Sequence, residues 1–281
     1  SENAARQVQE NARNRLICPT GFPILTGQVG FPADGNNRGT KGTMATEFNR
    51  GSVLNRTAAA AQVDEGLRSY MLRVYNYMTT GLALTGVVAF LVASSPAALN
   101  LIFGTGLHWV VILAPIGLVF FLSARIHKMS AAAAQISFWI FAALMGLSLA
   151  SVFIIYTQES IARVFFITAA TFAAMSLYGY TTKRDLSGLG SFLFMGLTGI
   201  VIASIVNIFI GSTMMQFIIS AVGVLVFVGL TAYDTQKIKE MYSELDGSEV
   251  AGKKAIMGAL RLYLDFINLF MMLLHLFGNR N

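Results

Sequence analysis

The sequence predicts an all-α membrane protein: a bundle of seven transmembrane helices with the seventh in the centre, preceded by a disordered N-terminal tail. Hydrophobic residues make up 55% of the 281 residues and charged residues only 12%, about half the charged share of an ordinary soluble domain. Charge is also unevenly spread, because residues 131–157 contain no Lys, Arg, Asp or Glu. So few polar residues cannot cover the surface of a water-soluble globule of this size.

The chain divides into two parts by composition. Residues 1–66 are polar and hold three of the five prolines, so we expect a largely disordered cytoplasmic tail. Within it, residues 58–70 fit two alternatives, a short amphipathic helix on the membrane surface or a solvated linker. Residues 67–281 form the predicted membrane domain.

Seven apolar segments follow the tail, each close to the roughly 20 residues that a helix needs to cross a hydrocarbon core. They must be helices, because a bilayer offers no solvent for unpaired backbone groups. Their many glycines and alanines allow close helix packing. The segments are 74–94, 107–124, 131–156, 161–180, 189–210, 214–235 and 255–277.

Basic residues occupy the tail flank and every second loop between the segments, and this alternation predicts the orientation. By the positive-inside rule the N-terminus is cytoplasmic, and seven crossings place Asn281 outside, although Arg280 lies beside it. A seventh segment that enters and returns is the alternative. Short basic clusters between apolar runs also disfavour nucleic acid as the partner behind the net charge of +6. The basic residues are Arg68, Arg73, Arg125, His127, Lys128, Lys183, Arg184, Lys237, Lys239, Lys253 and Lys254.

Ionisable residues inside the spans are concentrated in the last two segments. Such residues cost about 2.5–3.5 kcal/mol each on insertion scales and usually face the bundle interior. Asp234 lies about one turn inside the end of the sixth segment. Asp265 lies about 15 Å deep in the seventh, on one face with Arg261 and Asn268 at spacings of four and three.

These aspartates have a local and a functional interpretation. Locally, Asp234 would pair with Lys237, and Asp265 with Arg261, and only hold their helices in place. Functionally, two carboxylates in one low-dielectric site cannot both ionise cheaply, so the pair would titrate as a unit. Both ionised, they would attract a hard cation such as calcium, weakly, because calcium takes six to eight oxygen ligands.

Two segments resemble the signature of the transmembrane BAX inhibitor motif family, also called the Bax inhibitor family. They are Ala-Tyr-Asp-Thr-Gln-Lys-Ile at 232–238 and Leu-Tyr-Leu-Asp-Phe-Ile-Asn-Leu-Phe at 262–270. Supporting matches lie at 146–149 and 207–209, and the loop 181–187 resembles bacterial members. The resemblance covers residues 67–281.

The resemblance implies a seven-helix bundle that acts as a pH-sensitive calcium leak in a bacterial inner membrane. Asp234 and Asp265 would be the proton- and calcium-sensing pair, with a basic residue of the second helix, here Arg125, as the latch. It also implies links to the suppression of cell death in eukaryotes and to the modulation of membrane proteases in bacteria.

Three other classes compete with this hypothesis. An intramembrane aspartyl protease would need Gly-x-Gly-Asp where Leu262-Tyr263-Leu264 precedes Asp265, and a photoreceptor would need a lysine inside the seventh segment. A non-conducting membrane protein that regulates a protease or another partner stays open. We expect no enzyme activity and no cofactor, because no nucleophile–histidine arrangement stands out and Cys18 is the single cysteine.

Overall fold

The computed structural model describes residues 41–281, with side chains from Asp64 onward. These residues form α-helices and one short 3-10 helix, and no β-strand. Residues 55–281 form one compact unit, which is described below. In chain order the elements are α2 (Lys41–Ala93), α3 (Pro96–Phe103), α4 (Leu107–Arg125), η2 (Ile126–Lys128), α5 (Ala131–Ile155), α6 (Gln158–Thr181), α7 (Ser187–Ile210), α8 (Thr213–Glu240) and α9 (Ser248–Phe277).

Seven helices of the described region are long and apolar enough to cross a membrane: α2 from Asp64 onward, and α4 to α9. They correspond one to one to the predicted segments, so the predicted fold class is confirmed. Several extend past the predicted ends, because polar residues continue a helix beyond the hydrocarbon. The largest extension is in α2, which begins at Lys41 and not at residue 74. Helix α9 begins at Ser248 and not at residue 255.

Two features near the chain's start differ from the segment list. Helix α3 has no predicted counterpart, because eight residues are too few to cross a membrane. Its sequence signal is Ser95-Pro96: the Ser95 hydroxyl accepts a hydrogen bond from the Ala98 amide, and Pro96 stands at the first helical position. Residues 1–40 of the predicted tail lie outside the described residues. From Lys41 the chain is helical, and this helix continues without a break into the first span.

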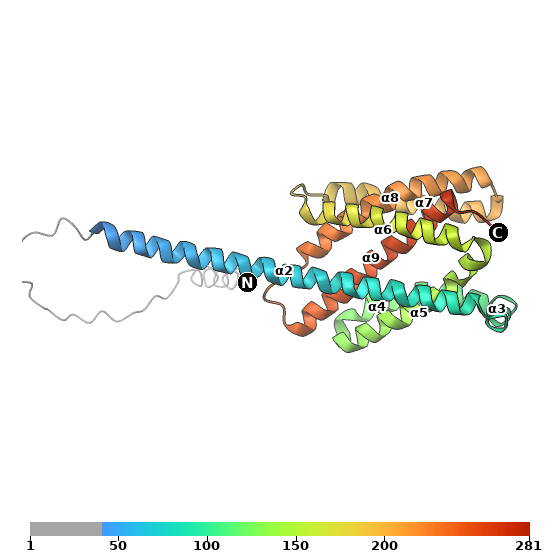
Figure 1. Cartoon of the computed structure of the whole chain (residues 1–281), viewed down its shortest axis with the longest axis horizontal. Helices are drawn as coiled ribbons and strands as arrows, with labels where there is room; N and C mark the ends of the chain where they lie inside the picture. Colours follow the sequence, from blue (N-terminus) through green and yellow to red (C-terminus); the bar gives the residue numbers. More distant parts are fainter. Residues whose placement is uncertain (1–40) are drawn as a thin grey trace, which may run out of the picture. The chain divides into compact units, whose positions relative to one another are not determined.

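Helix α9 lies between two groups of helices (Figure 1). On one side α6, α7 and α8 pack together, and on the other side α4 packs on α5 with α2 nearby. Helix α9 contacts α8, α6 and α5 directly. A side chain at Gly81 of α2 would press on the Phe138 ring of α5, so α2 packs closely against α5 at this point.

Burial confirms that the seventh span is the central one. In the apolar part of α9, 67% of the residues are buried inside the protein, whereas the other six spans reach at most 33%. The outer helices instead expose large apolar side chains, such as Phe209 of α7 at 86%. In a membrane these exposed faces meet lipid, so they are already in an apolar environment.

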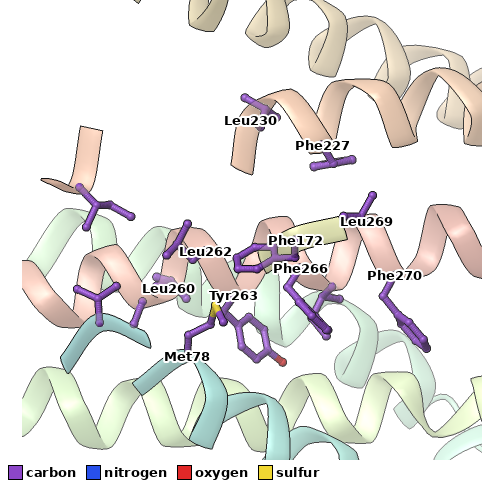
Figure 2. Close-up of a cluster of buried hydrophobic side chains, with 14 of the residues drawn as sticks. Met78, Phe172, Phe227, Leu230, Leu260, Leu262, Tyr263, Phe266, Leu269 and Phe270 are labelled. Carbon is purple, nitrogen blue, oxygen red and sulfur yellow. The ribbon is translucent and has the colours of Figure 1, made fainter. Parts of the chain in front are cut away.

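The core around α9 is built from large side chains on several of its faces. Figure 2 shows Leu269 opposite Phe227 of α8, and Tyr263 beside Met78 of α2. Tyr263 is fully buried, and Phe266 packs edge-on against Phe172 of α6. Because other helices surround α9, most of its side chains must pack against a neighbouring helix.

Helix α9 crosses the bundle completely, which removes the alternative of a segment that enters and returns. It has 30 residues without a break, about 45 Å at the helical rise. Its far end joins the α5–α6 connection, where the amide of Thr157 donates to the carbonyl oxygen of Asn279 at 3.0 Å and that of Asn281 to Ile155 at 2.9 Å. Its near end follows the short connection from α8.

Candidate functional site

A cavity of about 830 Å³ borders one face of α9, and α4, α7 and α8 form its other walls. Asp265, Arg261 and Asn268 of α9 line it, together with Asp234 of α8. The spacing of four and three residues places the three α9 residues on one side of the helix. Four of the predicted site residues therefore share one cavity.

Asp265 is the most deeply placed of these groups. Its side chain is only 5% exposed, and its Oδ2 atom is buried without a hydrogen-bond partner among the described residues. A buried carboxylate oxygen without a partner is costly in a low-dielectric interior. The site therefore favours either a proton on the carboxyl group or a cation beside it.

Asp234 approaches Asp265 from the neighbouring helix. The two carboxyl groups lie within interaction range of one another, and the Arg261 guanidinium acts on both. Asp234 is partly exposed, so the pair has one buried member and one member open toward the cavity. Helices α8 and α9 bring the aspartates together because a short connection holds them as packed neighbours.

The local ion pairs considered from the sequence do not form. Lys237 pairs with Glu240 at 2.7 Å and not with Asp234. No ion pair within 4.0 Å joins Arg261 to Asp265 among residues 64–281. The aspartates are therefore not neutralised by a close cation on their own helices.

Arg125, the latch implied by the resemblance, lies in the last turn of α4 and is exposed. It does not line the cavity, where α4 contributes Val119 and Ser123. In the described structure no ion pair links Arg125 to either aspartate. Its role as a latch stays a prediction.

The cavity also contains polar residues that sequence reasoning missed. Ser123 of α4 and Ser191 and Thr198 of α7 contribute hydroxyl groups to its walls. Serine and threonine are common in transmembrane helices and often bond to their own backbone, as Thr198 does to the Phe194 carbonyl oxygen at 2.9 Å. No sequence signal separates them from such residues, because only the packing of α4 and α7 around α9 directs them to one cavity.

Residues at the end of α8, within and just after the first resembling segment, hold neighbouring loops in place. The Gln236 side chain accepts a hydrogen bond from the Leu186 amide and donates one to the Arg184 carbonyl oxygen, both at 2.8 Å. Lys239 donates to the Tyr180 carbonyl oxygen at 2.9 Å. These bonds attach the α6–α7 loop to the end of α8, beside Asp234.

The oxygen groups of the cavity are fewer than the ligands that a calcium site uses. No group of three or more His, Cys, Asp or Glu side chains converges within the described residues. Two carboxylates and the Asn268 amide fall short of the six to eight oxygen ligands of bound calcium. The missing ligands would have to come from water in the cavity.

Comparison with known proteins places the membrane domain in one family. Residues 67–281 match the family model described as "Inhibitor of apoptosis-promoting Bax1". The "Inner membrane protein YbhL" of Escherichia coli (strain K12) is 51% identical over 228 residues, which are 80% of this chain and 97% of that protein. An uncharacterized protein of Caulobacter vibrioides is 43% identical over 244 residues, covering 83% of this chain and 98% of its own. The matched region contains the whole cavity.

Proposed function

The chain belongs to the Bax inhibitor family, and on this basis we propose that it is a pH-sensitive calcium leak channel controlled by Asp234 and Asp265. It crosses the membrane several times. We further propose that it lies in a bacterial inner membrane, as the name of the E. coli relative suggests, with a cytoplasmic N-terminus. The basic loops favour this orientation.

The observation that carries the proposal is the unpaired carboxyl group of Asp265 in a cavity shared with a second aspartate. A buried carboxylate of this kind is retained in a membrane protein when it serves an ion or proton path. A purely structural residue would be expected to have a close partner. The side-chain oxygens around it offer a passing cation a partial replacement for its water shell.

The proposed mechanism is an exchange of protons for calcium at the aspartate pair. With a proton shared between Asp234 and Asp265, the cavity presents no strong attraction to a cation, and the path stays closed. When the pair loses its proton, the two carboxylates attract calcium from the cavity. Arg261 lies within range of both and would compete with the cation, which keeps the site weak and the ion mobile.

Calcium entry into liposomes that hold the purified protein tests this proposal. We expect calcium entry to rise from about pH 6 to about pH 8, because the pair titrates as a unit in a low-dielectric site and attracts calcium once it has lost its proton. Asp265→Asn and Asp234→Asn should each remove the pH dependence. Glu159→Gln, at an exposed carboxyl group away from the cavity, is the matched control and should keep it.

Two results would contradict the proposal. One is calcium entry no faster than into empty liposomes from protein that is shown to be folded. The other is an unchanged pH profile in both aspartate variants. The first result would favour a non-conducting regulator of a membrane protease or another partner, for which the aspartates would matter only to the fold.

A further inference from the structure

A second concave surface lies between α2 and α6, on a different face of α9 from the aspartate cavity. Its walls run from Arg68 to Val87 on α2 and from Phe165 to Tyr180 on α6, and Phe266 of α9 forms its floor. Its volume is about 1000 Å³. Phe266 points away from the aspartate cavity, because successive helical residues are separated by about 100°. We call this surface the α2–α6 groove.

The groove opens sideways. Leu72, Val87 and Leu177 in its walls are each more than half exposed. Since α2 and α6 cross the membrane, whatever reaches these side chains is the hydrocarbon of the bilayer. A concave apolar surface surrounds a chain on several sides and gives it more contacts than a convex helix face does.

Three polar side chains in the middle of the groove already have hydrogen-bond partners. The Tyr75 hydroxyl bonds to the Ser176 hydroxyl at 2.5 Å, and Ser176 bonds in turn to Thr235 at 3.0 Å. The Thr79 hydroxyl donates to the Tyr75 carbonyl oxygen at 2.8 Å. The groove interior therefore makes no demand for a polar ligand, and an apolar chain fits it.

One end of the groove is cationic. The Tyr75–Ser176 bond sets the antiparallel register of α2 and α6, which places Arg68 and Tyr180 toward the same end. Arg68 is exposed, and it forms no ion pair with Asp64 or Glu65 one turn earlier. The Lys239 ammonium group lies 5.0 Å from the centre of the Tyr180 ring. Arg68 thus lines this end of the groove, and Lys239 lies beside it against Tyr180.

The length of the groove also fits a lipid. From Arg68 to Val87 the helix rises by about 28 Å, close to the thickness of a hydrocarbon core of about 30 Å. If a lipid phosphate lies at Arg68, the acyl chain of that lipid can occupy the half of the groove that begins at Arg68. The rise from Arg68 to Met78 is about 15 Å, which is about one leaflet.

We propose that the α2–α6 groove binds one acyl chain of an anionic phospholipid, with the lipid phosphate held by Arg68 and with Lys239 nearby. The apolar walls select the chain, and the two cations select a negatively charged headgroup. The proposal does not depend on ion conduction, because none of its residues lines the aspartate cavity.

Photo-crosslinking tests the proposal on the whole protein in lipid nanodiscs. The probes are phosphatidylglycerol and phosphatidylcholine that carry a photoreactive group on one acyl chain, and labelled peptides are located by mass spectrometry. We expect phosphatidylglycerol to label residues 68–87 and 165–180 more strongly than the exposed helix α7. Arg68→Gln should remove the preference for phosphatidylglycerol over phosphatidylcholine and leave chain labelling in place.

Filling the groove provides the second arm. Ala173→Trp, in the α6 wall, should lower labelling of the groove about tenfold, which corresponds to about 1.4 kcal/mol of lost affinity. Ala174→Trp, at the next position, exposed and outside the groove, is the matched control. Ala83→Phe, in the opposite wall, replaces Ala173→Trp if that variant fails to fold.

Three outcomes would overturn the proposal. Labelling could follow exposed area alone, with α7 labelled as strongly as the groove and Ala173→Trp without effect. The phosphatidylglycerol preference could survive Arg68→Gln. Crosslinks between two copies of the chain at the groove would show that a second copy covers it. Calcium entry into liposomes, measured for the same variants, distinguishes a failure of the lipid proposal from a failure of the leak proposal.

Discussion

Helices α7 and α9 both cross the membrane, yet they relate to the rest of the protein in opposite ways. The apolar part of α7 is only 17% buried inside the protein, whereas that of α9 is 67% buried. The buried helix is the less hydrophobic of the two, because it carries Arg261, Asp265 and Asn268. In a bilayer the solvent is itself apolar, so hydrophobicity alone does not draw a helix to the centre. Polar groups and close packing do.

The largest expected effect tests the packing of α9 against that of α7. Tyr263→Ala removes a fully buried ring that packs against Phe138 and Phe141 and whose hydroxyl bonds to Thr85 at 2.6 Å. We expect the free energy of unfolding to fall by about 3–5 kcal/mol, measured by titration with denaturing detergent. Phe192→Ala in α7 removes a ring that is 65% exposed and should change stability by less than about 0.5 kcal/mol. Equal losses would contradict the central position of α9.

A smaller effect is expected at two glycines. A side chain at Gly179 of α6 would collide with the backbone carbonyl of Ala232 in α8, whereas nothing lies near Gly199 of α7. Gly179→Ala should therefore cost about 1–3 kcal/mol through overpacking. Gly199→Ala should be neutral, or stabilise by up to about 1 kcal/mol, because alanine favours the helix. The two melting temperatures in mild detergent measure the difference, and a tolerated Gly179→Ala would show that α6 and α8 can separate freely.

The smallest effect concerns the loop before α7. The hydroxyl and amide of Ser187 donate hydrogen bonds to the Asp185 carboxylate, which lowers the pKa of Asp185 below its ordinary value. A lowered pKa means that the carboxylate supports the folded loop above the ordinary value and loses that support as the pH falls through the lowered pKa. Ser187→Ala should raise the pKa toward its ordinary value in a carboxyl NMR titration. Ser191→Ala, one turn further on, should leave it unchanged, and an unmoved pKa in Ser187→Ala would contradict this assignment.

The seven spans and the polar stripe of α9 could be predicted from residues close together in the chain. About 20 apolar residues must form a helix in a bilayer, whatever surrounds them. The spacing of Arg261, Asp265 and Asn268 places them on one face by helical geometry alone, and all three line one cavity in the structure.

The partners of those residues could not be predicted in the same way. Lys237 was as well placed for Asp234 by spacing as for Glu240, and the structure pairs it with Glu240. The hydroxyl groups of Ser123, Ser191 and Thr198 look like ordinary helix residues until α4 and α7 pack around α9. The α2–α6 groove likewise exists only because two helices distant in sequence stand apart over Phe266. Local sequence is enough where a bilayer imposes the helix, but many pairings of similar apolar surfaces have nearly equal energy, and only the packed bundle selects one.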